Sequence, residues 1–191
     1  MEKEIIFKEE LSLIINPVIK EWVRKTLLNA PGYFYTAMAS STGKYHPACT
    51  CKIGGLIIHV KRAVFMANRL CRGFGIEDAD KDIVIAAITL HDIAKVGQGS
   101  GSYDDYVNHP LNAEKYFADF RTEDSEVIGK INFCIKHHMG LWTPDSIKKP
   151  LKEYSNLELV VYIADFMATT KEIDTPLDGD KNKSVADSLP F

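Results

Sequence analysis

The chain lacks an excess of basic residues, a long apolar run and a recognisable leader. Its 191 residues carry a formal net charge of -3, so we expect no broad cationic face for tight binding of long nucleic acid. No apolar run reaches the roughly 20 residues that cross a bilayer, and the first four residues, MEKE, do not open a signal peptide. We therefore expect a cytoplasmic protein that does not associate with a membrane.

Cysteine is also scarce, with four residues in the whole chain. Cys49 and Cys51 form a Cys-x-Cys pair, which is a weak zinc signal without a second pair. Cys71 and Cys134 stand alone in apolar stretches. We expect reduced, structural thiols rather than disulfides.

What the chain does contain is helical periodicity. At 191 residues and 46% hydrophobic, it is long enough for one domain with a substantial core. Apolar spacing and turn signals predict helices near residues 4–15, 18–28, 56–70, 77–90, 108–117, 124–138 and 156–171, with Asn108 and Asn156 as caps. No strand pattern competes with them, so the fold class is all-α.

We expect this helical domain to cover residues 1–174. In this reading, N-terminal helices within residues 1–32 pack on a core of residues 40–172, and residues 175–191 form a peripheral tail. The stretch from Tyr33 to Gly55 is rich in Ser, Thr, Gly, Pro and aromatics. Such long ordered loops in compact domains are usually functional.

The segment that organises the chain is an apolar helix that ends in His91, Asp92 and, three residues later, Lys95. Burying unpaired charge is costly, so these side chains need partners. An imidazole beside a carboxylate can hold a divalent cation. A lysine one turn further on can meet an anion that the cation attracts.

Other candidate ligands are spread over four more helices: His59 on an apolar stripe, His109 at a helix start, His137 and His138 at a helix end, and Asp165 in the last helix. Each has an ordinary alternative. His59 alone would be a core residue, His109 an extension of a cap, and the adjacent pair a surface feature. Asp165 lies among apolar residues, where an unpaired carboxylate is costly. Together they favour a metal site.

The order His…His-Asp…His…His-His…Asp resembles the HD-domain metal-dependent phosphohydrolase superfamily, over roughly residues 40–172. The segments GGLIIHVKRAV, LHDIAK, HHMG and YIADFM carry the resemblance. The segment HPACTCKIGGLIIH, followed by HDIAK and HHMGLW, is also similar to the YhaM-type 3′-to-5′ exoribonuclease branch. The fold that this implies is an HD-domain helical bundle with irregular loops around a metal site.

The resemblance also implies a ligand set. A first ion would be held by His59, His91, Asp92 and Asp165. Asp92 would bridge to a second ion held by His109, His137 and His138. Mixed nitrogen and oxygen ligands suit Mn²⁺, Fe²⁺, Co²⁺, Ni²⁺ or Zn²⁺, and the sequence does not choose between them.

The function that follows is hydrolysis of a phosphoester in a nucleotide or short nucleic acid by a metal-activated water, with a phosphodiester slightly favoured. Asp92 and Lys95 are the predicted catalytic residues, and Lys95 would contact a phosphate oxygen. We expect the segments Gly97 to Tyr106 and Ser40 to His46 to form substrate walls, with Lys44 and His46 touching phosphate. The partner is a phosphorylated small molecule or short nucleic acid, and a homo-oligomer is left open.

Two rival functions use the same residues. Some HD-domain proteins are di-iron oxygenases; those carry a single histidine where this chain has His137-His138, and the lack of a lysine like Lys95 would favour them. Lys95 and the second histidine therefore favour hydrolysis. The other rival is a non-catalytic nucleotide sensor, which predicts tight nucleotide binding without turnover.

Overall fold

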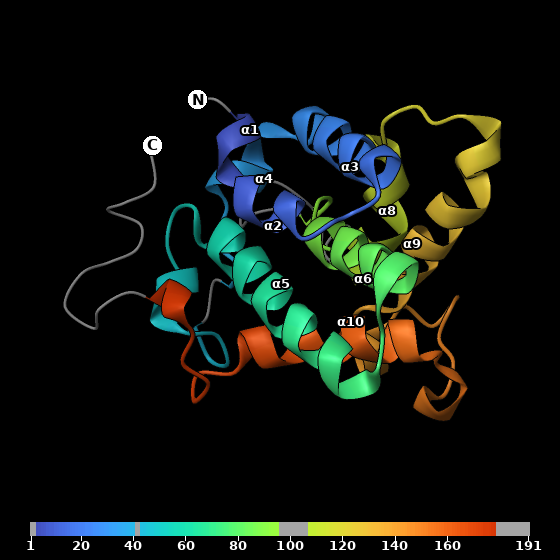
Figure 1. The fold of residues 1–191 in the computed structure, drawn as a ribbon. Coiled ribbons are helices and arrows are strands. Elements are labelled where there is room, and N and C mark those ends of the chain that lie inside the picture. The colour runs from blue at the N-terminus through green and yellow to red at the C-terminus, as the bar shows by residue number, and fades with distance from the viewer. Residues whose placement is uncertain (1–2, 41–42, 96–106, 179–191) are drawn as a thin grey trace.

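The computed structural model describes residues 3–40, 43–95 and 107–178. Within these ranges the chain forms helices and no strand, which confirms the all-α prediction. The helices are α1 (Lys3–Ile6), α2 (Lys8–Ser12), α3 (Pro17–Asn29), α4 (Gly32–Thr36), α5 (Gly55–Phe74), α6 (Asp78–Leu90), α8 (His109–Asn112), α9 (Ser125–His137) and α10 (Asn156–Thr169) (Figure 1). Among the helices described, none has both the length and the apolar character needed to cross a membrane.

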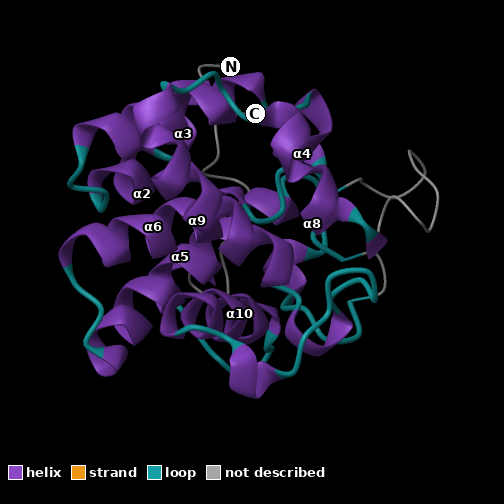
Figure 2. Ribbon diagram, turned by 90° about the vertical axis from the view of Figure 1, so that its right-hand side faces the viewer, coloured by secondary structure: helices purple, strands orange, loops and turns teal. Residues whose placement is uncertain are grey.

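Helix α6 lies at the centre of the bundle. Its residues from Ile83 to Leu90 are all buried, and the helix contacts α3, α5, α9 and α10. Figure 2 shows the N-terminal helices and α10 on opposite sides of α6. A helix that is apolar all round can only be accommodated in this way, so the apolar run before His91 explains why that residue lies deep in the molecule.

Helix α5 is the longest helix in the described part of the chain and runs beside α6. Gly54 precedes it with a φ of 75°, and Gly75 follows it with a φ of 63°. Both values lie in the left-handed region that glycine adopts without strain. Gly55 lies against the backbone carbonyl of Thr50, which a β carbon would meet. These glycines fix where the helix begins and ends.

Two buried acids hold the N-terminal helices on this core. The Asp82 carboxylate on α6 accepts hydrogen bonds from the backbone N–H groups of Ile15 and Asn16, at 2.8 and 2.7 Å. The Glu10 carboxylate pairs with Lys61 of α5 at 2.8 Å. The chain segment before α3 is thereby fastened to α5 and α6.

Three local predictions were wrong. The helix predicted over residues 4–15 is broken at Phe7, whose fully buried ring stacks on Phe34 at a centroid distance of 6.1 Å. Asn108 makes no side-chain capping bond, and α8 passes into a 3₁₀ turn (Ala113–Tyr116) after one turn. The cap of α10 is Ser155 rather than Asn156, in a reciprocal capping box with Glu158.

The first residues after α10 are held against α5 by hydrogen bonds from Arg62. Arg62 of α5 is fully buried. Its guanidinium donates to the carbonyls of Ala168 and Ile173 at 3.1 and 2.8 Å, and to the Thr175 hydroxyl at 3.3 Å. Thr175 is therefore part of the packed structure, and residues 179–191 of the predicted tail lie outside the described residues.

Candidate metal centre

The site is built around the end of α6, where the helix stops after Leu90 and the chain makes two tight turns. The N–H of Ile93 donates to the Leu90 carbonyl at 3.0 Å, and that of Lys95 to the Asp92 carbonyl at 2.9 Å. Neighbours within a regular helix would point about 100° apart. Here the two adjacent side chains converge, with His91 Nε2 lying 3.5 Å from Asp92 Oδ2.

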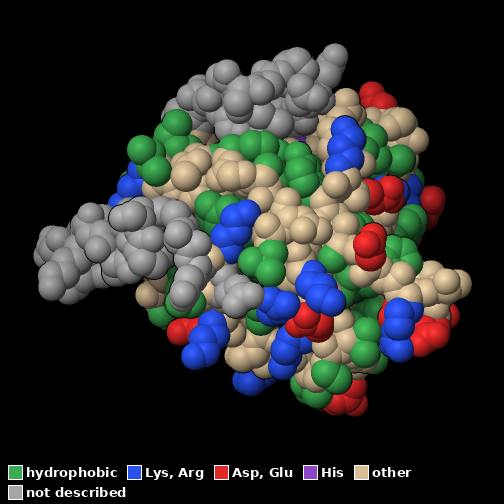
Figure 3. Space-filling view, turned by 90° about the horizontal axis from the view of Figure 1, so that it is seen from above, with side chains coloured by type: hydrophobic (Ala, Val, Ile, Leu, Met, Phe, Trp, Pro, Cys, Tyr) green, Lys and Arg blue, Asp and Glu red, His purple; other side chains and the backbone are tan. Residues whose placement is uncertain are grey.

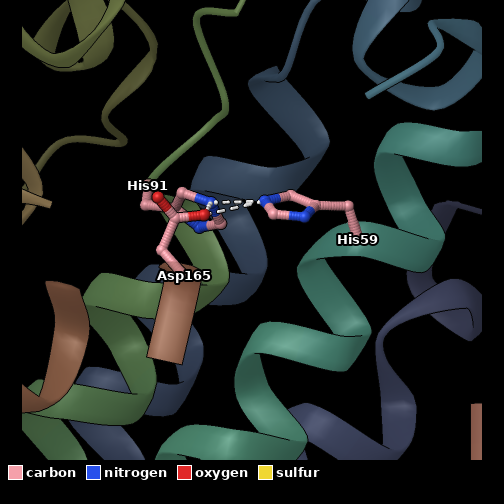
Figure 4. Close-up of side chains that lie close together, drawn as sticks. All are labelled: His59, His91 and Asp165. Atoms are coloured by element: carbon pink, nitrogen blue, oxygen red, sulfur yellow. Dashed lines mark hydrogen bonds and ion pairs between the residues drawn. The ribbon is translucent and has the colours of Figure 1, made fainter. Parts of the chain in front are cut away.

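A first group of ligand atoms comes from α5, the end of α6 and α10. His59 Nε2 lies 3.2 Å from His91 Nε2 and 3.0 Å from Asp165 Oδ1, and His91 Nε2 lies 3.5 Å from that oxygen. Figure 4 shows these three side chains pointing toward one another. Both histidines are fully buried, whereas the Asp165 side chain is 18% exposed, so this group reaches the surface at Asp165.

A second group is formed with the start of α8 and the end of α9. His109 Nε2 lies 3.1 Å from His138 Nε2 and 3.0 Å from Asp92 Oδ1. His138 Nε2 lies 3.6 Å from the same oxygen. All three side chains are buried.

Asp92 stands between the two groups. Its Oδ2 atom lies 3.5 Å from the Nε2 atoms of both His59 and His91. Its Oδ1 atom faces His109 and His138 instead. One carboxylate therefore presents one oxygen to each group, which is the arrangement that a bridging ligand requires.

Two of the histidines are oriented by backbone carbonyls. The Nδ1 atoms of His91 and His138 each lie 2.7 Å from the carbonyl three residues earlier, that of Ile88 and of Ile135. A carbonyl only accepts hydrogen bonds, so Nδ1 carries the proton in each case. The Nε2 atoms face the cluster, as metal-ligating histidines usually do.

The electrostatics of the site favour charged carboxylates. Burial alone would raise the pKa of Asp92, but the charges of Lys95 and His91 outweigh it and hold this pKa well below its usual range. Burial likewise opposes ionisation of Asp165, and hydrogen bonds from His59 and His91 hold its pKa well below the usual range. The site therefore concentrates two negative charges in a buried space.

The pKa values of the histidines in the site shift in different directions. Burial lowers the pKa of His59, and burial together with the charges of His91 and His109 lowers that of His138 to about 3. Burial also disfavours the charged form of His91, but Asp92 and Asp165 raise its pKa to about 10. In the protein alone, a proton on His91 offsets the carboxylates. A divalent cation would supply the same positive charge and displace that proton.

The residues fit a divalent metal site. Asp92 Oδ1 is buried without a hydrogen bond of acceptable geometry, although His109 Nε2 lies 3.0 Å away. Ring nitrogens face one another in both groups, and two sets of three side chains, His59-His91-Asp165 and His91-Asp92-His138, bring their ligand atoms within 4.8 Å. Such convergence of imidazole and carboxylate is what transition metals bind. Among the described residues, Cys49 and Cys51 belong to no such group.

His137 is the one predicted ligand that the structure does not bring into the cluster. Its Nδ1 atom lies 2.9 Å from the Phe133 carbonyl and 3.1 Å from Glu158 Oε1, and its Nε2 atom lies 3.1 Å from the Ile147 carbonyl. The reason is that His137 still belongs to α9, whereas His138 follows the end of the helix. Adjacent side chains there point in different directions, and only His138 turns inward.

The predicted substrate contacts lie at different distances from the cluster. Lys95 Nζ lies 2.8 Å from Asp92 Oδ2. The His46 ring is 5.5 Å from that of His59, centroid to centroid, and burial together with the charge of His59 lowers its pKa to about 3. The ammonium of Lys44 lies over the Tyr45 ring at 5.0 Å. The predicted wall at residues 97–106 lies outside the described residues, as do residues 41–42 of the other wall.

Sequence reasoning missed two supports of the site. Glu158 Oε2 accepts a hydrogen bond from Lys149 at 3.0 Å, and Glu158 Oε1 lies 3.1 Å from His137 Nδ1 at the end of α9. The pattern Ser155-x-x-Glu158 was a visible signal of a capping box. Arg62 was missed because a lone arginine off the apolar stripe normally points to water.

On the face shown in Figure 3, the charged side chains of both signs are interspersed, in agreement with the lack of a basic excess.

Comparison with known proteins gives one match. The family model for the HD domain matches residues 56–169, which include every residue of the two groups. No curated protein and no solved structure matches the chain.

Proposed function

The chain belongs to the HD-domain family, and on that premise we propose that it is a metal-dependent phosphohydrolase. We propose further that it cleaves a phosphoester in a nucleotide or short nucleic acid, with a phosphodiester slightly favoured. The observation that carries the proposal is the position of Asp92, whose two oxygens face two separate histidine groups.

The ligand set that we propose has two parts that share one residue. His59, His91, Asp92 and Asp165 would hold a first ion, and Asp92, His109 and His138 a second. His137 is omitted because both of its ring nitrogens have other partners. Mn²⁺, Fe²⁺, Co²⁺, Ni²⁺ and Zn²⁺ all suit this donor set.

Bound divalent ions supply an activated water and offset the negative charge of phosphate. The protein's own contribution comes from Lys95, whose side chain is 12% exposed and whose ammonium lies 2.8 Å from Asp92 Oδ2. If a phosphate group bound beside Asp92, this ammonium could donate a hydrogen bond to one of its non-bridging oxygens. Asp165 marks the side from which substrate would approach, since it is the one partly exposed member of the first group, with 18% of its side chain exposed.

Of the two features that distinguished a hydrolase from a di-iron oxygenase, one still applies and the other does not. The second histidine no longer separates the two functions, because His137 does not face the cluster. Lys95 still does, since it lies 2.8 Å from Asp92. A charged lysine beside the shared carboxylate suits phosphate better than dioxygen.

The test is hydrolysis by protein stripped of metal and reloaded separately with each candidate ion. A generic phosphodiester, a phosphomonoester, nucleotides and short RNA would be compared. We expect metal-dependent release of phosphate or a nucleotide product, abolished in Asp92→Ala and retained in His137→Ala. An oxygen-dependent product, or nucleotide binding without turnover under every metal, would contradict the proposal in favour of one of the rivals.

A further inference from the structure

Exposed apolar side chains lie on the turn Gly140–Trp142, which follows His138, and on α10, which carries Asp165. Leu141 and Trp142 are 55% and 61% exposed, and Phe166 is 50% exposed. Tyr162 is half-buried. We refer to Leu141, Trp142, Tyr162 and Phe166 as the aromatic surface. Single exposed apolar residues are common, but here the turn that carries Leu141 and Trp142 packs through Gly140 against Tyr162, which neighbours Phe166.

Tyr162 joins the two segments. Its ring lies directly against the α carbon of Gly140, where a β carbon would collide with the ring. Gly140 also has a φ of 57°, so both the backbone conformation and the contact call for glycine. The Tyr162 and Phe166 rings are 6.4 Å apart, centroid to centroid. The turn Gly140–Trp142 therefore packs on the outer face of α10.

The aromatic surface lies on the same two segments that supply His138 and Asp165. Phe166 is the residue after Asp165, the exposed member of the first group. Tyr162 precedes Asp165 by three residues, which places both on neighbouring positions of the helix surface. The turn that carries Trp142 begins two residues after His138. Each of the two segments that bear these rings thus also carries a proposed ligand of the centre.

We propose that the aromatic surface stacks the nucleobase of the substrate, and this rests on the proposed function because the metal centre would hold the attached phosphate. The four side chains carry no charge that could pair with phosphate, whereas the rings of Trp142, Tyr162 and Phe166 offer flat faces. Flat exposed rings bind the faces of bases, and removal of one stacking ring typically weakens binding by roughly five- to 150-fold, or about 1–3 kcal/mol. The substrate is therefore a base-bearing phosphoester.

The first test compares two ligands that differ only in the base. These are the non-hydrolysable 5′-methylenephosphonate analogues of adenosine monophosphate and of ribose 5-phosphate, each titrated into metal-loaded protein by calorimetry. We expect the base-bearing analogue to bind at least fivefold more tightly. Trp142 supplies a second readout, because the only other tryptophan, Trp22, is buried. The base-bearing analogue should quench Trp142 fluorescence, and the base-free analogue should not.

The second test uses substitutions at exposed positions, where the fold should be retained. Phe166→Ala and Trp142→Ala should weaken binding of the base-bearing analogue at least fivefold and leave the base-free analogue unchanged. Trp142→Phe should keep the affinity but lose the quenching. Phe74→Ala is the matched control, since Phe74 is 38% exposed and lies at the far end of α5 from His59. It should change neither affinity.

The outcomes separate the two proposals. If both analogues bind alike, base stacking is overturned while the proposed function stands. If neither binds, base stacking is overturned, and the hydrolysis test described above decides the proposed function separately. If Trp142→Ala changes the oligomeric state and the two analogues still bind alike, the surface belongs to a contact with a second copy and the base proposal is wrong.

Discussion

Arg62 offers the sharpest link between the fold and the site. It lies on α5, one turn after His59, and its guanidinium donates to the Ala168 carbonyl at the end of α10. It also donates to the carbonyls of Thr170 and Ile173, at 3.3 and 2.8 Å. The helix that supplies His59 therefore holds the end of the helix that supplies Asp165. We predict that Arg62→Met destabilises the fold and weakens metal binding together.

The expected cost follows from the groups left without a donor. Methionine keeps the apolar stem but removes every hydrogen bond, and a buried acceptor that is left unpaired costs about 1–3 kcal/mol. The Ala168 carbonyl and the Thr175 hydroxyl are paired through buried bonds, whereas the carbonyls of Thr170 and Ile173 are partly buried and can regain water. Part of this loss is offset, because the variant no longer has to remove a charged guanidinium from water when it folds. We expect a loss of about 3 kcal/mol, a large share of the 5–15 kcal/mol of a typical domain.

The assay is urea unfolding of the metal-free protein, followed by metal titration of the folded variant. Arg69→Met is the matched control, because Arg69 is exposed on the same helix and its guanidinium lies 3.5 Å from the centroid of the Phe65 ring. It should cost no more than about 1 kcal/mol. The reasoning would be refuted if Arg62→Met cost no more than the control, or if metal affinity stayed at the wild-type value.

Three further predictions test other parts of the structure. Asp82→Ala should cost about 2–4 kcal/mol in urea unfolding, because two backbone N–H groups lose a buried acceptor; hydrogen exchange should quicken first in α3, and unchanged exchange there would contradict this. His109→Ala should reduce the bound metal from two ions to one, while His137→Ala should leave it at two; equal losses would refute the ligand set. Burial raises the pKa of Cys71 to about 11 and of Cys134 to about 12, so a thiol reagent at pH 8 should label the other two cysteines first, and four equal rates would refute the burial.

Long-range apolar periodicity made the fold readable from the sequence. The helices α5, α6, α9 and α10 carry enough apolar residues at helical spacing to be placed within a few residues of their observed bounds. Local signals were less reliable. Phe7 interrupts a segment with helical spacing because its ring packs against Phe34, a tertiary contact that periodicity does not contain. Asn156 and Ser155 are both good caps, and only the capping box with Glu158 distinguishes them.

The sequence identified most residues of the candidate site, but not the direction in which each side chain points. Six of the seven predicted ligands converge, because buried histidines and carboxylates need partners wherever they lie. The seventh, His137, has the same residue type as His138 and the adjacent position. Which of the two turns inward depends on where α9 ends, and helix ends are uncertain by one or two residues from sequence. Arg62 shows the same limit, since its partners are backbone carbonyls that no pattern of side chains reveals.

The most direct test of the central claim is to locate the metal by anomalous scattering in crystals of the loaded protein. The account predicts two peaks on either side of Asp92, one among His59, His91 and Asp165 and the other beside His109 and His138. A single peak, or peaks that do not involve Asp92, would contradict the account.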